Sequence, residues 1–152
     1  MAIRDFRAVV ERRRRGGVAL KVPFDPAAAW GERDRYDVTG SIEGHKVRGK
    51  LVARDGGYYL ELGPAWCRND VLREGQMASV SLQPEGPQVV AMDDDIASAL
   101  NAAPEARRFF ESLPTFYRKN YMRWVLEAKQ PETRARRVAE MVELLSAGKR
   151  ER

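Results

Sequence analysis

The residues best suited to chemistry in this sequence gather on both sides of a proline near the C-terminal end. Three cations, Lys129, Arg134 and Arg137, follow two aromatic residues, Tyr121 and Trp124. A helix that begins at the proline would offer free N–H groups and a partial positive charge beside these cations. Arginine side chains bind carboxylates and phosphates through paired hydrogen bonds. The pattern therefore predicts an anion-binding site built from Lys129, Arg134 and Arg137, with Trp124 and Tyr121 nearby.

Ordinary helix chemistry accounts for the same residues in a second way. Pro131 and Glu132 are favoured in the first turn of a helix, and Glu132 can pair with Arg136 one turn later. Trp124 and Tyr121 have the spacing of an apolar helix stripe, which is typical of core packing. The residues alone leave both interpretations open.

The composition favours a folded protein of the reducing cytoplasm. The 152 residues are 43% hydrophobic and include three Trp, which is typical of a chain that buries a core. No apolar run approaches the roughly 20 residues needed to span a bilayer, and the first residues lack the apolar stretch of a signal peptide. The single cysteine, Cys67, cannot form an internal disulfide. We therefore expect a cytoplasmic protein without a transmembrane segment.

Charge is distributed unevenly along the chain. The net charge is +5 overall, +5 over residues 1–24, −6 over residues 25–106 and +6 over residues 107–152. Basic ends attract acidic partners such as nucleic acid, and the run Arg12–Arg15 before two glycines would suit phosphate contacts. Solubility, or docking of one part of the chain on another, accounts for the same asymmetry. Nucleic-acid binding through the basic ends is therefore the alternative function.

Residues 1–92 have the pattern of short strands joined by tight turns. Alternation of apolar and polar residues between turn signals predicts strands over 6–10, 18–22, 36–42, 45–52, 58–62, 77–82 and 88–91. A short helix is expected over 27–30, with Asp25 as its cap and Gly31 at its end. Gly40 and Gly49 fall inside strands, where glycine suits strong bending. Six or seven such strands predict a small N-terminal β-barrel domain over residues 1–92.

From residue 93 the apolar residues recur with a helical period. Three aspartates over 93–95 favour a helix start and are expected to cap it, and Pro104 is expected in the first turn of the next helix. Apolar stripes follow over 117–128 and 135–145, with Gly148 as the C-cap. The chain is therefore predicted to be an α+β protein, with a helical tail over residues 93–152.

The other reactive residue types lack the partners that catalysis or metal binding requires. His45 is the only histidine and follows a turn glycine, so we expect it to be exposed. A zinc site needs three or four ligands, Cys67 supplies one thiolate, and three consecutive aspartates cannot all face one cation. Phosphate-loop, dinucleotide, metalloprotease and serine-hydrolase signatures are absent. We therefore expect no cofactor, no metal site and no catalytic residues.

Two sets of residues resemble known bacterial families. The first two-thirds of the chain is similar to a small β-barrel domain of unknown function, through Val22-Pro23-Phe24-Asp25, Trp30-Gly31, residues 38–44 and 47–51, Asp95-Ile96 and Ala99-Leu100. The last third resembles the bacteriocin-protection, YdeI or OmpD-associated (OmdA) family, through Phe110, Leu113-Pro114, Tyr121, Trp124, Ala128-Lys129, Glu132-Thr133-Arg134, Arg137 and Leu144-Leu145. The resemblance implies a double-split or closely related β-barrel with appended helices. It also implies a loose link to bacteriocin tolerance or the cell envelope, and no assigned reaction.

These features favour a non-enzymatic protein of this family type that binds a small ligand or a partner. We expect an anionic small molecule or a protein as that partner. Nucleic-acid binding remains the alternative, and an enzyme acting on a small polar substrate, in a groove between barrel and helices, is a third hypothesis.

Overall fold

The computed structural model describes residues 3–152, apart from the side chain of Asn69. The chain divides into two compact units. The first extends to Glu32 and resumes over residues 36–85, and the second comprises residues 33–35 and 86–152.

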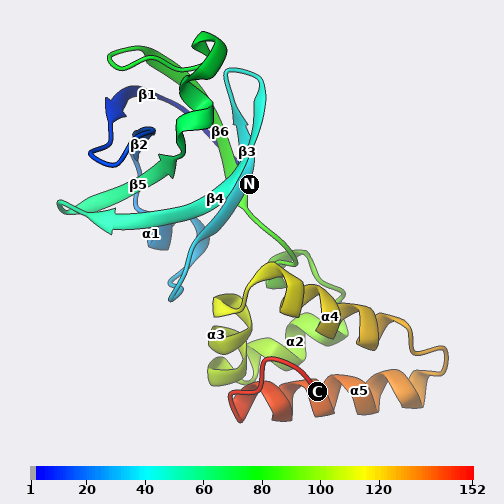
Figure 1. The fold of residues 1–152 in the computed structure, drawn as a ribbon. Coiled ribbons are helices and arrows are strands. Elements are labelled where there is room, and N and C mark those ends of the chain that lie inside the picture. The colour runs from blue at the N-terminus through cyan, green and yellow to red at the C-terminus, as the bar shows by residue number, and fades with distance from the viewer. Residues whose placement is uncertain (1–2) are drawn as a thin grey trace. The chain divides into compact units, whose positions relative to one another are not determined.

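Six antiparallel strands close into a barrel in the first unit, in the order β1-β2-β5-β4-β3-β6 (Figure 1). The strands are β1 (Arg4–Arg12), β2 (Val18–Val22), β3 (Asp37–Ile42), β4 (His45–Arg54), β5 (Gly57–Leu62) and β6 (Met77–Pro84). Alternate residues of each strand face inward, and they form one core that includes Val10, Leu20, Ile42, Leu60 and Leu82. The predicted N-terminal barrel is confirmed.

Two short helices lie outside the barrel strands. Helix α1 (Pro26–Trp30) begins where the Asp25 carboxylate accepts a hydrogen bond of 3.1 Å from the Ala27 N–H, as predicted. The 3₁₀ segment η1 (Pro64–Asp70) follows β5, and its Trp66 packs against the barrel core. The ring of His45, which is exposed as expected, lies 6.5 Å from the Trp66 ring.

The strand expected over residues 88–91 is wrong. This segment contains a 3₁₀ turn, η2 (Val89–Ala91), and Val89 is buried in the core of the second unit. Strand β6 already pairs with β1 on one side and β3 on the other. Because the barrel is closed without it, the segment has no sheet edge to join.

Four helices form the second unit, namely α2 (Asp94–Asn101), α3 (Pro104–Ser112), α4 (Thr115–Leu126) and α5 (Pro131–Ser146). Prolines stand in the first turn of α3 and α5, where a missing N–H costs nothing. Gly148 follows α5 with φ of 75° and donates to the Leu145 carbonyl, as a C-terminal cap does. The predicted C-terminal helices are confirmed.

The helical unit has a core of its own, and α5 packs against α2, α3 and α4. Fully buried Phe110, Leu100 and Met141 lie at its centre. Arg118 is also buried, and it donates to the carbonyl oxygens of Leu113 and Pro87 at 3.0 and 3.1 Å. This guanidinium joins the chain entering the unit to the turn before α4.

Candidate functional site

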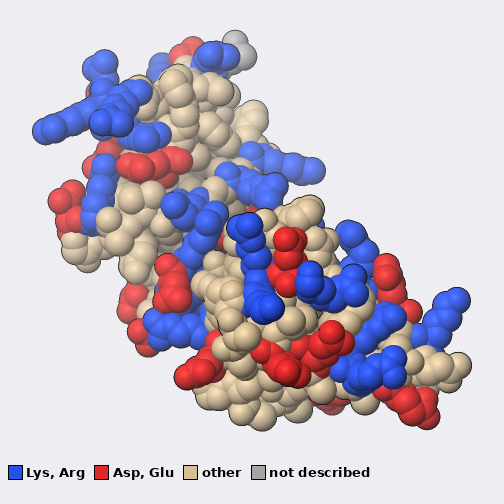
Figure 2. Space-filling model, turned by 60° about the horizontal axis from the view of Figure 1, so that its bottom comes forward, with Lys and Arg blue, Asp and Glu red and all other residues tan. Residues whose placement is uncertain are grey.

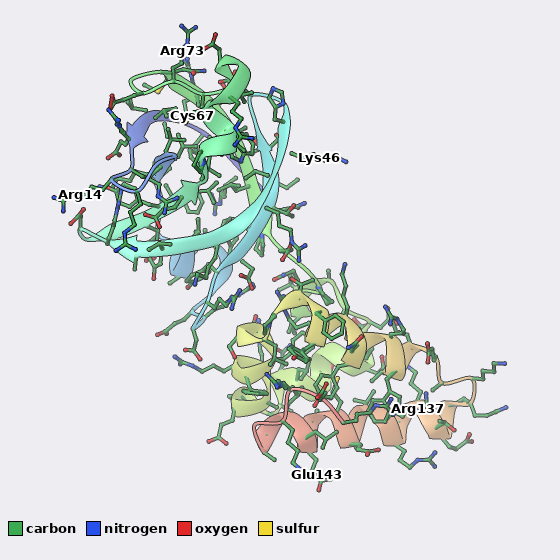
Figure 3. The ribbon with its side chains drawn as sticks, in the orientation of Figure 1. Arg14, Lys46, Cys67, Arg73, Arg137 and Glu143 are labelled. Carbon is green, nitrogen blue, oxygen red and sulfur yellow. The ribbon has the colours of Figure 1, made fainter. Side chains whose placement is uncertain are left out.

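Helices α4 and α5 place the aromatic and cationic residues that the sequence singled out. A break at residues 127–130 separates the two helices, and Pro131 begins the second. Figure 3 shows Arg137 on the side of α5 that faces α4, and Glu143 on the opposite side. The site is therefore built between two helices of one unit.

Tyr121 is buried in the core, with 2% of its surface exposed. Its hydroxyl donates a hydrogen bond of 2.6 Å to the carbonyl oxygen of Lys149. Burial raises the pKa of Tyr121 above its ordinary value of 10.0, and the nearby Glu151 carboxylate acts in the same direction. Tyr121 thus holds the segment after α5 against α4 through a neutral hydroxyl.

Trp124 is half-buried and carries two guanidinium groups on its ring. The Arg137 guanidinium lies 5.6 Å from the ring centroid and donates a hydrogen bond of 2.8 Å to the Trp124 carbonyl oxygen. The Arg152 guanidinium lies 4.6 Å from the same ring. Cations over the face of an indole are attracted by its quadrupole, so the ring is a binding surface for cationic planes.

A pocket of about 290 Å³ opens between α4 and the end of the described chain. Its lining residues are Asn120, Tyr121, Arg123, Trp124, Glu127, Arg150, Glu151 and Arg152. The lining thus contains three arginines, two glutamates and the aromatic residues Tyr121 and Trp124. Arg150 also packs over the Tyr117 ring at 5.1 Å, which helps to hold this wall of the pocket in place.

Arg134 is engaged by two aspartates at the start of α2. Its guanidinium donates to both oxygens of Asp95 at 2.7 and 2.8 Å, and to Asp93 at 2.9 Å. The hydrogen bond from Arg134 lowers the pKa of Asp95 below its ordinary value of 3.8, and the two carboxylates raise the pKa of Arg134. Arg134 thus fastens α5 to α2.

The predicted capping role of the aspartates needs a correction. Asp93 occupies the N-cap position of α2, but its side chain makes no capping hydrogen bond. Its carboxylate accepts from Arg134 instead, because a guanidinium offers a charged donor where the backbone offers a neutral one.

Lys129 is exposed in the connection between α4 and α5 and does not line the pocket. The structure thus brings Tyr121, Trp124 and Arg137 together. Arg134 faces α2 from another side of α5, and Lys129 lies in the connection before α5. The sequence analysis did not predict six of the lining residues, namely Asn120, Arg123, Glu127, Arg150, Glu151 and Arg152. The charged run after Gly148 was the available signal for the last three, but only its return onto α4 makes them part of a pocket.

Charges of both signs cover the helical unit on the face shown in the lower part of Figure 2. The basic residues of this unit are thus interspersed with acidic residues on that face. Among residues 3–152, no group of three or more His, Cys, Asp or Glu side chains is arranged to hold a metal ion. Within the same range, no helix has the length and apolar character to cross a membrane.

The fold and the pocket define a small closed β-barrel joined to a helical unit with an aromatic and arginine-rich pocket. Comparison with protein families gives two matches. Residues 6–82 match the family described as Domain of unknown function (DUF1905), and residues 89–148 match Bacteriocin-protection, YdeI or OmpD-Associated. The chain belongs to the DUF1905 family, and its helical part is similar to the Bacteriocin-protection, YdeI or OmpD-Associated family. No curated protein matches the chain.

Proposed function

We propose that the helical unit is a binding module for a small anionic ligand, held in the pocket between α4 and residues 150–152. One observation carries the proposal: Arg123, Arg150 and Arg152 line a cavity of about 290 Å³. Arginine presents a rigid fork of donors that matches carboxylate and phosphate groups. Since the lining carries one more cation than anion, it favours a ligand with negative charge.

Trp124 adds a flat apolar surface to this charged pocket. The Arg152 guanidinium lies 4.6 Å from the Trp124 ring centroid. A planar ligand that takes the place of this guanidinium would stack on the Trp124 ring, and its acid group could pair with the displaced guanidinium. The cavity is near the lower end of the roughly 300–1,000 Å³ of ligand pockets. The class of ligand is therefore a small acid, with a phosphate or carboxylate group on a single ring.

The five residues predicted from the sequence enter this proposal in different roles. Tyr121 and Trp124 form the wall, and Arg137 supports the Trp124 ring. Arg134 acts from a distance by fixing α5 to α2, and Lys129 adds to the positive potential beside the helix break.

Binding, rather than catalysis, is the function that the lining supports. It offers guanidinium, amide, carboxylate and aromatic groups, and the one hydroxyl, that of Tyr121, is engaged by Lys149. A general base paired with a nucleophile is the usual arrangement of a hydrolytic site, and the lining does not contain one. We take the cytoplasm as the compartment and ligand binding as the step through which a YdeI-like protein would act.

Thermal shift and calorimetric titration with defined acids test the proposal. The probes are inorganic phosphate, benzoate and phenyl phosphate, of which the last two carry the acid group on a single ring. Arg123→Ala should weaken binding of the best probe by about tenfold or more, because a hydrogen bond to a charged group contributes about 1.5–3 kcal/mol. Arg136→Ala is the matched control, since Arg136 is exposed on α5 and lies outside the pocket lining.

Two further variants separate the roles given to the more distant residues. Lys129→Ala should weaken binding only at low ionic strength, and Arg134→Ala should weaken it by loosening α5. A wild-type chain that responds to none of the probes would overturn the proposal. So would an Arg123→Ala variant that binds as well as the Arg136→Ala control.

A further inference from the structure

A row of cations runs along the outer face of strand β4. Because successive side chains of a strand point to opposite faces, the buried Val47 and Leu51 place the even-numbered residues outside. Four of these are basic, namely Lys46, Arg48, Lys50 and Arg54. Figure 1 shows β4 as the long strand that sweeps across the barrel wall. The row lies in the part of the chain with net negative charge, so composition concealed it.

The row is long enough to meet several phosphates of one nucleic-acid strand. Every second residue of a β-strand is about 6.6–6.8 Å further along, so Lys46 and Arg54 lie about 27 Å apart along β4. Val52 stands between Lys50 and Arg54 on the same face. The four cations can therefore meet the backbone of one extended nucleic-acid strand at four places.

The charges of the row are only partly neutralised by neighbouring acids. Arg48 forms an ion pair with Glu85, and Arg54 lies 3.4 Å from Glu61. Asp37 is the cross-strand neighbour of Lys50 on β3. Within residues 3–152, Lys46 and Lys50 have no ion pair, and both are exposed. Figure 3 shows Lys46 projecting away from the barrel.

More basic residues continue the row beyond Arg54. Glu61 is shared between Arg54 and Arg13, with the Arg13 contact at 3.7 Å. Arg13 belongs to the turn between β1 and β2, where Arg14 is exposed and points outward (Figure 3). Lys21 of β2 is the cross-strand neighbour of Tyr59, which carries the Arg54 guanidinium on its ring. Basic residues therefore lie on β4, on β2 and in the turn between β1 and β2, while β5 between β2 and β4 contributes Tyr59 and Glu61.

A flat group suited to stacking lies at one end of the row. There the Arg54 guanidinium lies 4.1 Å from the centroid of the Tyr59 ring. Unpaired bases stack on aromatic rings and on guanidinium planes. The large exposed hydrophobic residues of the barrel, Ile3, Val9 and Met77, lie on or beside β1 and β6, so β4 does not present a membrane-inserting surface.

We propose that the outer face of β4 binds single-stranded nucleic acid, with Lys46, Arg48, Lys50 and Arg54 on the phosphate backbone and the Arg54 guanidinium beside a base. A linear cationic track with stacking groups is how proteins hold single strands without reading their sequence. This interaction is separate from the helical pocket, and its four cations on β4 belong to the middle of the chain.

Fluorescence anisotropy with labelled single-stranded RNA and DNA of mixed sequence tests the proposal on the whole chain. Four phosphate contacts predict a slope of about −2.8 for log K against log salt. Affinity should then fall about 50-fold between about 50 and 200 mM salt. Lys46→Ala combined with Lys50→Ala should halve this slope, because two of the four contacts are lost.

A second double variant provides the charge-matched control. Lys119→Ala with Arg136→Ala removes two exposed cations from the helical unit and changes the net charge equally. It should bind like the wild type. A third variant, Arg54→Lys, keeps the charge but removes the plane, so affinity should fall about fivefold or more while the slope is retained.

Several results would overturn the proposal. These are failure of the wild type to bind either strand at low salt, an equal loss in both double variants, and equal binding of duplex or heparin, which would indicate a general polyanion surface. Circular dichroism of each variant shows that the barrel is folded, so a loss of binding reports the surface and not the fold.

Discussion

Tyr121→Phe is expected to loosen one wall of the pocket without disturbing the core. The substitution keeps the buried ring and removes only the hydroxyl that donates to the Lys149 carbonyl at 2.6 Å. The segment 149–152 would then depend on the stacking of Arg150 on Tyr117 and of Arg152 on Trp124.

The size of the effect follows from the few contacts that hold this segment. One hydrogen bond contributes about 0.5–1.5 kcal/mol, and each exposed cation–π contact about 0.5–1 kcal/mol. Losing about 1 kcal/mol raises its detached population about fivefold.

Amide hydrogen exchange measures this population directly. The Lys149 amide, which donates to the Leu144 carbonyl at 3.0 Å, should exchange about fivefold faster in Tyr121→Phe, while amides in the middle of α4 keep their protection. Tyr117→Phe is the control, because it keeps the ring under Arg150 and leaves the Tyr121 hydroxyl in place. Unchanged exchange at the Lys149 amide in Tyr121→Phe would refute the reasoning that this hydrogen bond holds the pocket wall.

The pH dependence gives a second readout of the same group. Burial raises the pKa of Tyr121 above 10.0, so the unfolded chain loses the phenol proton at a lower pH than the folded one. The stability contributed by the neutral hydroxyl is complete below about pH 10 and is lost as the pH rises through the folded pKa. The difference in unfolding free energy between wild type and Tyr121→Phe should therefore shrink from about pH 9 to about pH 11.

Three more substitutions probe contacts that position the two units' elements. Asp95→Asn should lower the free energy of unfolding near neutral pH. The difference in this free energy between the variant and the wild type should vanish as the pH falls through the lowered pKa of Asp95, because protonation breaks the pair with Arg134. Measuring the unfolding midpoint over an acid pH series checks this, and a constant difference down to about pH 2 contradicts it. Arg118→Leu should cost about 2–4 kcal/mol in urea unfolding, since two backbone carbonyls lose their buried donor; a loss under about 1 kcal/mol would show that water replaces the guanidinium. Gly40→Ala should lower the free energy of unfolding by about 1–3 kcal/mol or more, because the added Cβ would overlap a carbonyl oxygen of β6. Gly49→Ala should lower it less, because there the added Cβ meets only a flexible leucine methyl at 3.2 Å. An equal effect of the two substitutions would contradict this account.

Local sequence chemistry determined most of the secondary structure. The period-two pattern of β3 and β4, the Asp25 cap and the prolines that begin α3 and α5 act within a few residues. Such signals are readable along the chain, because they depend on near neighbours. The predicted strand over 88–91 is wrong because apolar residues are compatible with a strand and with a buried turn alike. The barrel is closed without this segment, so no open sheet edge was left for it to join.

The candidate site was readable from the sequence only in part. Helical spacing placed Tyr121 and Trp124 on one face of α4, and Arg137 reaches that face because α5 folds back beside it. Arg134 stands three residues earlier on the same helix, yet it faces α2 and its two aspartates. Whether a cation of α5 forms an ion pair depends on acidic residues about 40 positions away in the chain. The spacing of residues along one helix does not indicate where those acidic residues lie.

The sequence by itself determined which residue types recur at which period, including basic residues at positions 46, 48, 50 and 54 of the chain. Only the tertiary structure decided that these four face outward together, because burial of Val47 and Leu51 in a closed barrel selects one side of β4 for solvent. Likewise, only the return of residues 149–152 onto α4 turned separate arginines into the lining of a pocket. The physical reason is the same in both cases: propensity and alternation act between near neighbours, whereas the use of a charged side chain depends on what the folded chain packs against it.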